Sequence, residues 1–300
     1  MKKVVSVSLG SSQRNHSVET EILGEKFSIE RIGTDGSKKK AIDLIHTLDG
    51  QVDALGIGGT DLYIYAGNRR YMFRETKEIA HAAKLTPIVD GSGLKNTLER
   101  RVVEFIQQER ITELSGKKVL MVCAVDRFGM AEALTAAGCE MIYGDLIFAL
   151  GLPFPLRSLR SLDRLARILA PVLTQLPIHM LYPTGSQQEK GQPKFGTYYH
   201  DADIIAGDFH FIKKYMPADM TGKVILTNTV TTTDINMLKS RGVSKVITTT
   251  PEFAGRSFGT NVIEGVMVAL AQKRAEQMQE EDYHRLLDQI GFLPRIVTNE

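Results

Sequence analysis

The segment from residue 116 to residue 145 has the residue types of a nucleotide-binding turn, with one departure. An apolar run suited to a buried strand leads into a tight loop and then into helix-forming sequence that ends on a glycine. That order directs backbone N–H groups and a helix dipole at a phosphate. In the G-x-G-x-x-G spacing, the glycine positions fall on Ala124, Asp126 and Gly129, so the third alone is kept. Asp126 adds bulk and negative charge where a pyrophosphate would approach.

Two charged residues could complete this site. Arg127 could grip a phosphate bidentately in place of the missing glycines, or it could form a surface ion pair. Asp145 ends the next predicted strand, about twenty residues beyond the loop, where a carboxylate commonly binds an adenosine ribose. With that role its charge favours NAD over NADP, which carries a 2′-phosphate. Asp145 could equally cap a helix that begins at Leu146.

Polar residues also follow the later predicted strands. Gly207 would allow the backbone to approach a cofactor closely, and Asn228 or Thr229 could bind the nicotinamide amide or the substrate. Glycine and asparagine are also ordinary turn residues, so turn chemistry alone explains part of this pattern. His210 stands between two phenylalanines, which is more typical of a packed core histidine than of an acid–base group.

Lys95 is the candidate catalytic residue. It follows a predicted strand and a glycine-bearing loop, where an ammonium could stabilise or protonate an alkoxide, with Asp90 setting its charge state. A solvated lysine in the first turn of a helix is the alternative. Candidate substrate-binding residues are Asp61 and Tyr63 for hydroxyl groups and Arg256 and Asn261 for a carboxylate.

Alternating strands and helices predict an α/β protein with parallel sheets. We expect an N-terminal α/β substrate-binding domain at 1–112 and a Rossmann-like, doubly wound nucleotide-binding domain at 113–275, followed by a C-terminal helical tail at 276–300. A helix over 94–108 would link the domains. Other predicted elements are a hairpin turning at Gly24 and Glu25, helices over 38–48 and 261–275, and a strand over 178–182. Since ligands sit at the carboxyl ends of parallel strands, the loops there should converge on one cleft.

Composition indicates an ordinary globular protein. Of its 300 residues 43% are hydrophobic and 24% charged, and the formal net charge is +2, so no nucleic-acid partner is expected. Neither a signal peptide nor a membrane span is recognised, which favours a cytoplasmic protein without a membrane partner. No Cys/His cluster has metal-ligand spacing, and Cys123 and Cys139 are expected to be reduced thiols. The apolar segment 146–156 could serve as core or as the interface of a homo-oligomer.

Several segments carry a family resemblance, namely VSVSLGSS, ERIGTDG, DGSGLKNTLERRV, AVDRFGMAEAL, GDLIFALGLP and FGTNV. They resemble a bacterial group labelled quinate 5-dehydrogenase and, more distantly, the shikimate/quinate dehydrogenase family. The resemblance implies a substrate domain before a nicotinamide-binding domain, and a lysine and an aspartate beside a bound polyol acid. Lys95 is the positional match for the lysine, although the family's N-V-T-x-P-x-K pattern is absent. Ser11 and Ser12 lie near the strand where the family's carboxylate-binding serine pair is expected.

Three hypotheses about function follow. The leading one is an NAD-dependent alcohol dehydrogenase that acts on a small hydroxylated carboxylic acid such as quinate or shikimate. The alternative is a non-catalytic sensor of a small molecule or nucleotide, whose altered phosphate loop no longer supports turnover. A third assigns the acid at position 145 to S-adenosylmethionine, but the long series of strands after Asp203 favours a dinucleotide fold.

Overall fold

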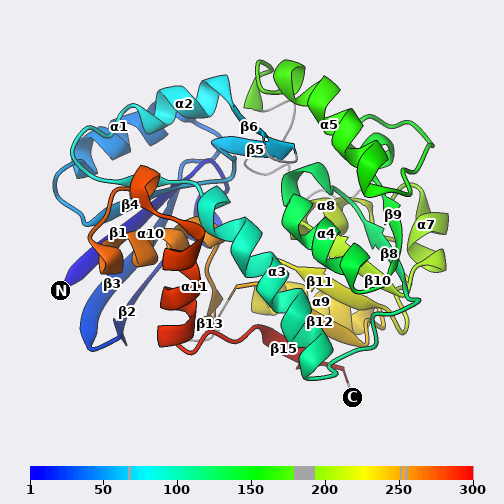
Figure 1. The fold of residues 1–300 in the computed structure, drawn as a ribbon. Coiled ribbons are helices and arrows are strands. Elements are labelled where there is room, and N and C mark those ends of the chain that lie inside the picture. Colours follow the sequence, from blue (N-terminus) through cyan, green and yellow to red (C-terminus); the bar gives the residue numbers. More distant parts are fainter. Residues whose placement is uncertain (67–68, 179–192, 251, 254–255, 300) are drawn as a thin grey trace.

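The structure is a computed structural model that describes residues 1–300 apart from 67–68, 179–192, 251, 254–255 and 300. It is an α/β protein with two mostly parallel sheets in separate regions (Figure 1). The predicted fold class is therefore confirmed. Part of the strand predicted over 178–182, from residue 179 on, lies outside the described residues.

The first sheet has the strand order β2-β3-β1-β4-β7. Its strands are β1 (Lys2–Ser8), β2 (His16–Ile22), β3 (Glu25–Gly33), β4 (Ala54–Gly58) and β7 (Ile88–Val89). β2 and β3 form the predicted antiparallel hairpin, and the remaining pairs are parallel. The helix α1 (Lys38–Leu48), also as predicted, and α2 (Arg74–Ala80) cover one face, where Val5 and Val7 of β1 are buried. A small hairpin of β5 (Tyr63–Ala66) and β6 (Arg69–Met72) follows β4 and contacts the helix α5 (Leu159–Leu173).

The opposite face of the first sheet is covered by α10 (Thr260–Ala271), which comes from the far end of the chain (Figure 1). Val262, Ile263 and Val266 of α10 pack with Val4 of β1 and with neighbouring strands. From sequence this helix was predicted to belong to the nucleotide-binding domain at 113–275. Its apolar periodicity indicated a buried face, but periodicity does not specify which of two sheets receives that face.

The second sheet has the order β15-β12-β11-β10-β8-β9. Its strands are β8 (Lys118–Met121), β9 (Glu140–Tyr143), β10 (Ile204–Gly207), β11 (Val224–Thr227), β12 (Lys245–Thr248) and β15 (Arg295–Thr298). Helices of this region are α4 (Phe128–Ala136), α5 (Leu159–Leu173), α7 (Gly196–Asp201), α8 (Phe209–Tyr215) and α9 (Thr232–Ser240). Alternate residues of β8 enter different cores, Val119 and Met121 with α4 and Leu120 with α8 and α9, so the sheet is doubly wound and Rossmann-like.

The last 25 residues differ from the predicted helical tail. α11 (Glu280–Gln289) is helical, but β15 pairs antiparallel with β12 at the edge of the second sheet. Ile296 and Val297 pack into the cores on opposite sides of that sheet. The β-branched run is therefore a strand, which the charged helical sequence before it obscured. A short hairpin, β13 (Glu252–Phe253) with β14 (Arg256–Ser257), was also not predicted.

The helix α3 (Ser92–Gln108) joins the two regions, as the sequence predicted, and packs against α4 on one side and α10 and α11 on the other. Glu264 of α10 fixes its beginning: Oε2 accepts a hydrogen bond from Gly91 N (2.7 Å) and Oε1 from the Tyr283 hydroxyl of α11 (2.6 Å). Burial, with the nearby charge of Asp90, raises the pKa of Glu264 to about 7.

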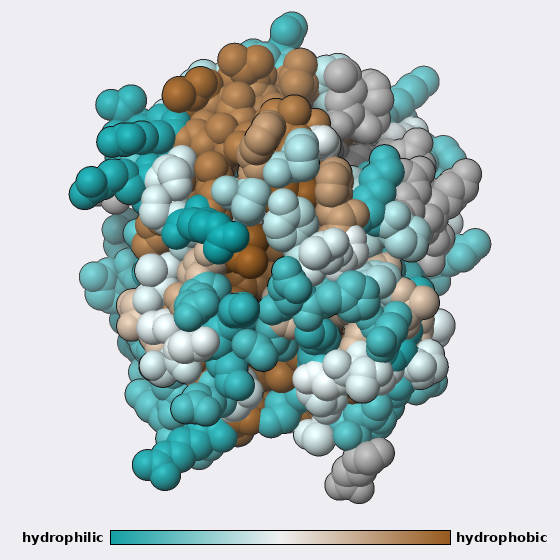
Figure 2. All heavy atoms as spheres, turned by 90° about the vertical axis from the view of Figure 1, so that its right-hand side faces the viewer, coloured by the Kyte–Doolittle hydropathy of each residue, from teal (hydrophilic) through white to brown (hydrophobic). Residues whose placement is uncertain are grey.

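Hydrophobic side chains gather on the face shown in Figure 2, at the top, over the part of the molecule where α5 lies in Figure 1. Ile168 and Val172 of α5 are 70% and 61% exposed, and Phe154 in the preceding loop is 64% exposed. None of the helices in the described part of the chain is both long enough and apolar enough to span a membrane.

Candidate functional site

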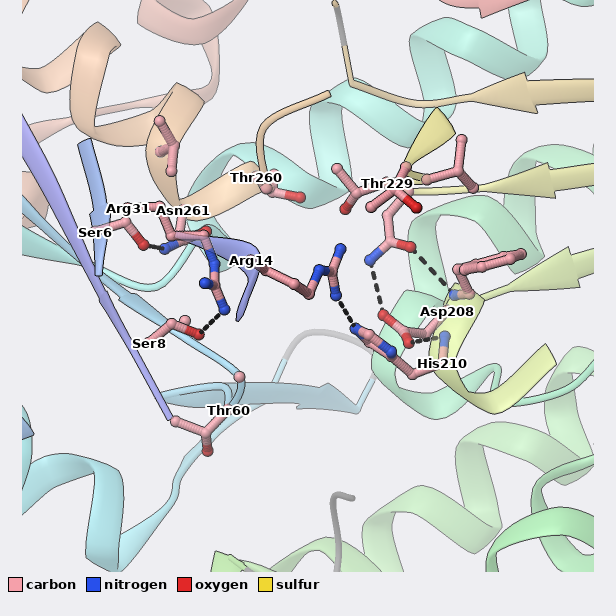
Figure 3. A pocket seen from close by; sticks show the side chains of 18 of the residues that line it. Ser6, Ser8, Arg14, Arg31, Thr60, Asp208, His210, Thr229, Thr260 and Asn261 are labelled. Atoms are coloured by element: carbon pink, nitrogen blue, oxygen red, sulfur yellow. Dashed lines mark hydrogen bonds between the residues drawn. The ribbon is translucent and has the colours of Figure 1, made fainter. Parts of the chain in front are cut away.

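A polar cavity of about 510 Å³ opens between the carboxyl ends of the two sheets. The loops that follow β1, β4, β10 and β11, the start of α10 and the turn before α4 all contribute to its wall (Figure 3). Of the residues predicted from sequence, the structure brings eight together here: Asp61, Asp90, Lys95, Asp126, Arg127, Asn228, Thr229 and Asn261.

The Lys95 ammonium joins the two halves of the cavity. Nζ lies 3.1 Å from Oδ1 of Asp61, in the loop after β4, and 2.9 Å from Oδ1 of Asp126, before α4. All three side chains are close to 90% buried. Burial alone would lower the pKa of Lys95, but the two carboxylates outweigh it and raise the pKa well above its usual value. Lys95 therefore stays protonated, which corrects the alternative of a solvated helix lysine.

Asp126 has a raised pKa. Burial and the charge of Asp61 raise its pKa to about 7, against the opposing effect of Lys95. Asp126 occupies the middle glycine position of the fingerprint, and its carboxylate is directed to Lys95. A group with this pKa can accept or return a proton near neutral pH.

Asp90 does not contact Lys95 directly. Its Oδ2 accepts hydrogen bonds from Leu62 N (2.5 Å) and Tyr63 N (3.2 Å), and Oδ1 accepts from the backbone and hydroxyl of Ser92. Burial, together with the charge of Asp61, raises its pKa. Asp90 thus holds the loop that carries Asp61, and its predicted catalytic role stays a prediction.

Arg127 is 3% exposed and pairs with two carboxylates of the protein. One guanidinium nitrogen pairs with Glu99 of α3, and the other lies 3.3 Å from Oδ2 of Asp208, which follows β10. Burial opposes its charge, but the carboxylates, Glu99 foremost, raise its pKa. Arg127 is therefore not a surface ion pair, and its charge is already balanced before any phosphate arrives.

The loop after β8 is filled from within by Asp145. Its Oδ1 accepts hydrogen bonds from Ala124 N and Val125 N, both at 2.9 Å. These N–H groups belong to the turn that would face a pyrophosphate. Burial raises the pKa of Asp145 to about 6, opposed by the two N–H groups. Asp145 begins a π-helical turn without capping it, since its carboxylate points to the loop.

The remaining fingerprint positions have packing roles. A Cβ on Gly129 would lie 2.9 Å from the backbone oxygen of Asn96, so this glycine lets α4 approach α3. Gly207 has φ +133°, and a Cβ there would lie 2.7 Å from Val122. The described residues of this loop therefore do not fit an NAD pyrophosphate in the usual position: its amides are occupied, its arginine is paired and its second glycine is an aspartate.

The other predicted cofactor and substrate residues are distributed as follows. Asn228 donates from Nδ2 to Asp208 (2.7 Å), and Thr229 lines the cavity beside it. Asn261 donates to the hydroxyl of Ser6 (2.6 Å). Ser11 and Ser12 bond within their own turn and to Asp35, and they do not line the cavity. Tyr63 lines a neighbouring cavity of about 430 Å³. Arg256 belongs to β14, and the Arg256 side chain lies outside the described part of the structure.

Four residues of the cavity wall that sequence reasoning missed come from the first region. Ser6 and Ser8 alternate along β1, so both point to the same side of the sheet, and Arg31 of β3 pairs in register with Ser6. Arg14 ends the 3₁₀ turn Ser12–Arg14. The Ser-Val-Ser alternation was the available signal for the serines. The arginines carried none, because strand pairing brings them to the cavity.

His210 from the second region also lines the cavity and is not a core histidine. Arg14 Nη1 lies 3.0 Å from its Nε2 (Figure 3). Because a guanidinium only donates, Nε2 accepts, and the neutral ring carries its proton on Nδ1. Burial, aided by the charge of Arg14, lowers the pKa of His210 in spite of the nearby Asp208.

Residues 93–299 match the family described as "Domain of unknown function (DUF8754)", and residues 3–90 match "Domain of unknown function (DUF8753)". Since the first match spans more than half of the chain, the chain belongs to the DUF8754 family. The sequence matches no curated protein.

Among solved structures, the chain is similar to a hetero-hexameric glutamate dehydrogenase from Thermus thermophilus, with a TM-score of 0.43, 10% identity, and coverage of 97% of this chain and 73% of that one. It is also similar to an NAD-dependent malic enzyme from Thermotoga maritima, with a TM-score of 0.34, 12% identity, and coverage of 96% of this chain and 84% of that one. For a sugar ABC transport substrate-binding protein from Bordetella parapertussis, the TM-score is 0.38 and the identity 10%, with coverage of 99% of this chain and 89% of that one. These arrangements are only distantly alike, and they assign no activity.

Proposed function

We propose that the protein binds a small hydroxylated organic acid in the cavity between its sheets, as a sensor or binding protein, without a dinucleotide on the loop after β8. The observation that carries this proposal is the Asp145 carboxylate, which accepts the hydrogen bonds of Ala124 N and Val125 N. A pyrophosphate would have to displace a buried carboxylate and meet the negative charge of Asp126. The loop after β8 would then have a structural role and would not bind a phosphate.

The cavity wall supports a hydroxylated acid as the ligand. Hydroxyl and amide side chains from both sheets line it, including Ser6, Ser8, Thr60, Thr229 and Asn261, alongside the guanidinium groups of Arg14 and Arg31. Polar groups of this kind can pair with several ligand hydroxyls at once, and arginine suits an acid group. Quinate and shikimate are suitable first probes because each combines a carboxylate with several hydroxyls.

A second candidate is an NAD-dependent alcohol dehydrogenase of the quinate/shikimate type, and Lys95 with its two carboxylates favours it. Protonated Lys95 could stabilise the alkoxide of a bound alcohol, while Asp126, with a pKa near 7, could accept the hydroxyl proton. Alkoxide stabilisation by Lys95 and proton acceptance by Asp126 do not depend on where the hydride acceptor binds. The occupied loop is the reason that this candidate stands second.

Calorimetry at high protein concentration separates the two. Quinate, shikimate, NAD and NADP are titrated singly, and absorbance at the nicotinamide band is followed with each acid and nucleotide together. Binding of an acid with no response to either nucleotide supports the sensor. Nucleotide binding with an absorbance change overturns it in favour of the dehydrogenase. If none of the four compounds binds, the dehydrogenase and a carboxylic acid as the sensed ligand are both overturned.

A further inference from the structure

Two of the three arginines that line the cavity, Arg14 and Arg31, differ from its other cations. Lys95 and Arg127 each pair with two carboxylates, and Lys213 lies 3.0 Å from Oδ1 of Asp234. Among the described residues, neither Arg14 nor Arg31 forms a salt bridge. The charge of Asp35 acts to raise the pKa of Arg31, but Asp35 is exposed and accepts the backbone N–H of Ser12.

Both guanidinium groups face the same space (Figure 3). Arg31 is held from behind, since Nη1 donates to Ser11 O (3.1 Å) and Nη2 to the Ser8 hydroxyl (3.0 Å). Arg14 reaches across the cavity to His210. Burial and, after it, the positive charge of Arg14 lower the pKa of Arg31 to about 10. The two groups therefore repel each other in a site partly withdrawn from water, and an anion between them would relieve that repulsion.

The donors that remain suit an anion with several oxygens. A guanidinium has five N–H donors in a planar fork. Arg31 uses two of them and Arg14 one in bonds to described residues. The Ser8 hydroxyl accepts from Arg31 Nη2 and from Gly10 N, so its own hydrogen remains to donate. A single carboxylate would neutralise one of the two charges and offers two oxygens, whereas a phosphate monoester carries nearly two charges and three oxygens.

We infer that the acid group of the ligand is a doubly charged phosphate, held between Arg14 and Arg31 with the Ser8 hydroxyl at its edge. This inference rests on the proposed function, because it assigns the charge of the ligand that the cavity takes. The ligand would then be a phosphorylated hydroxy compound with its hydroxyls toward Lys95 and Asn228.

The test is calorimetry of inorganic phosphate, sulfate and acetate at pH 7.5 and constant ionic strength. We expect phosphate to bind at least ten-fold more tightly than acetate. Arg14→Gln and Arg31→Gln should each weaken phosphate binding by ten-fold or more. Arg31→Lys, which keeps the charge and loses the fork, should fall between wild type and Arg31→Gln. Arg160→Gln, at an exposed position at the start of α5, is the matched control and should bind as wild type does. Unfolding curves confirm that each variant is folded.

Each outcome separates this inference from the proposed function. Phosphate that binds no better than acetate, or equally to wild type and to folded Arg14→Gln, overturns the phosphate site. If quinate or shikimate binds in that case, the proposed function stands. Phosphate binding that is lost in both arginine variants, with no binding of quinate or shikimate, supports the phosphate site and overturns carboxylic acids as ligands.

Discussion

Nζ of Lys95 and Oδ1 of Asp126 lie 2.9 Å apart at the junction between the two sheets, and Asp61 binds the same ammonium from the other side. One buried cation thus pairs with two buried carboxylates that belong to different regions of the fold. Substitution of the cation and substitution of one carboxylate should therefore lower the free energy of unfolding by different amounts.

Lys95→Met leaves two buried carboxylates without a cation, whereas Asp126→Asn leaves Lys95 paired with Asp61. We expect Lys95→Met to lower the free energy of unfolding at pH 7 by about 3–5 kcal/mol and Asp126→Asn by about 1–2 kcal/mol, since removing one member of a buried pair strands the other. Urea unfolding followed by circular dichroism measures both. Equal losses would show that Asp61 and Lys95 do not form a self-sufficient pair.

Two substitutions of Asp145 test its contact with the loop after β8. Asp145→Ala removes the acceptor of two backbone N–H groups and should lower the free energy of unfolding by about 2–4 kcal/mol. Asp145→Asn keeps an amide oxygen in that place and should cost about half as much or less. Chemical unfolding of both variants at pH 7 gives the comparison. A milder effect of alanine than of asparagine would contradict the loop-filling role.

Glu264 should make the protein less stable as pH rises toward neutrality. Its folded-state pKa of about 7 lies above the unfolded value of about 4.3. Its contribution is therefore fully present below about pH 4 and is lost as pH rises through 7, at no more than about 1.4 kcal/mol per pH unit. Asp126 and Asp145 act in the same direction.

Urea midpoints at pH 5, 6, 7 and 8 measure this slope in wild type and in Glu264→Gln. The variant lacks the titrating group, so the difference in stability between the two proteins should change between pH 5 and pH 7 in favour of the variant. Parallel pH profiles would mean that Glu264 does not hold a proton in the folded protein.

Gly129→Ala tests whether this glycine serves helix packing. The added Cβ would lie 2.9 Å from the Asn96 backbone oxygen and closer still to its side-chain oxygen. We expect a loss of about 1–3 kcal/mol in the free energy of unfolding. Gly196→Ala, a helical glycine whose Cβ would have no atom nearer than 3.9 Å, should be neutral or slightly stabilising. Thermal unfolding of the pair provides the measurement.

Local pattern predicted much of this fold. The three lysines and the apolar spacing after Ser37 define α1, and Ser37 accepts the capping hydrogen bond from Lys40 N. The strand β11 has the predicted bounds, Val224–Thr227. Such elements follow from nearest neighbours in sequence. The destination of α10 and the pairing of β15 do not, because each depends on a surface formed by residues far away in the chain.

The candidate site shows the same division. Lys95 and Asp126 were identified because each stands next to a glycine-bearing or fingerprint loop. Arg14, Arg31 and His210 were not, because strand register and the meeting of two sheets bring them together. The loop contact of Asp145 was not predicted, for a related reason: position predicted a carboxylate at the end of β9, but the direction of its side chain is set by the amides of the neighbouring loop.

The covering of the first sheet by α10 also bears on how the protein is made. During synthesis β1, β4 and β7 leave the ribosome long before residues 260–271 do, so Val4, Ala54 and Val89 remain without their native cover until α10 has been translated. In chains of successive domains the N-terminal domain usually folds first. Here the N-terminal region cannot complete its core before α10 is available. Both sides of the cavity acquire their final form together, after α10 has been released.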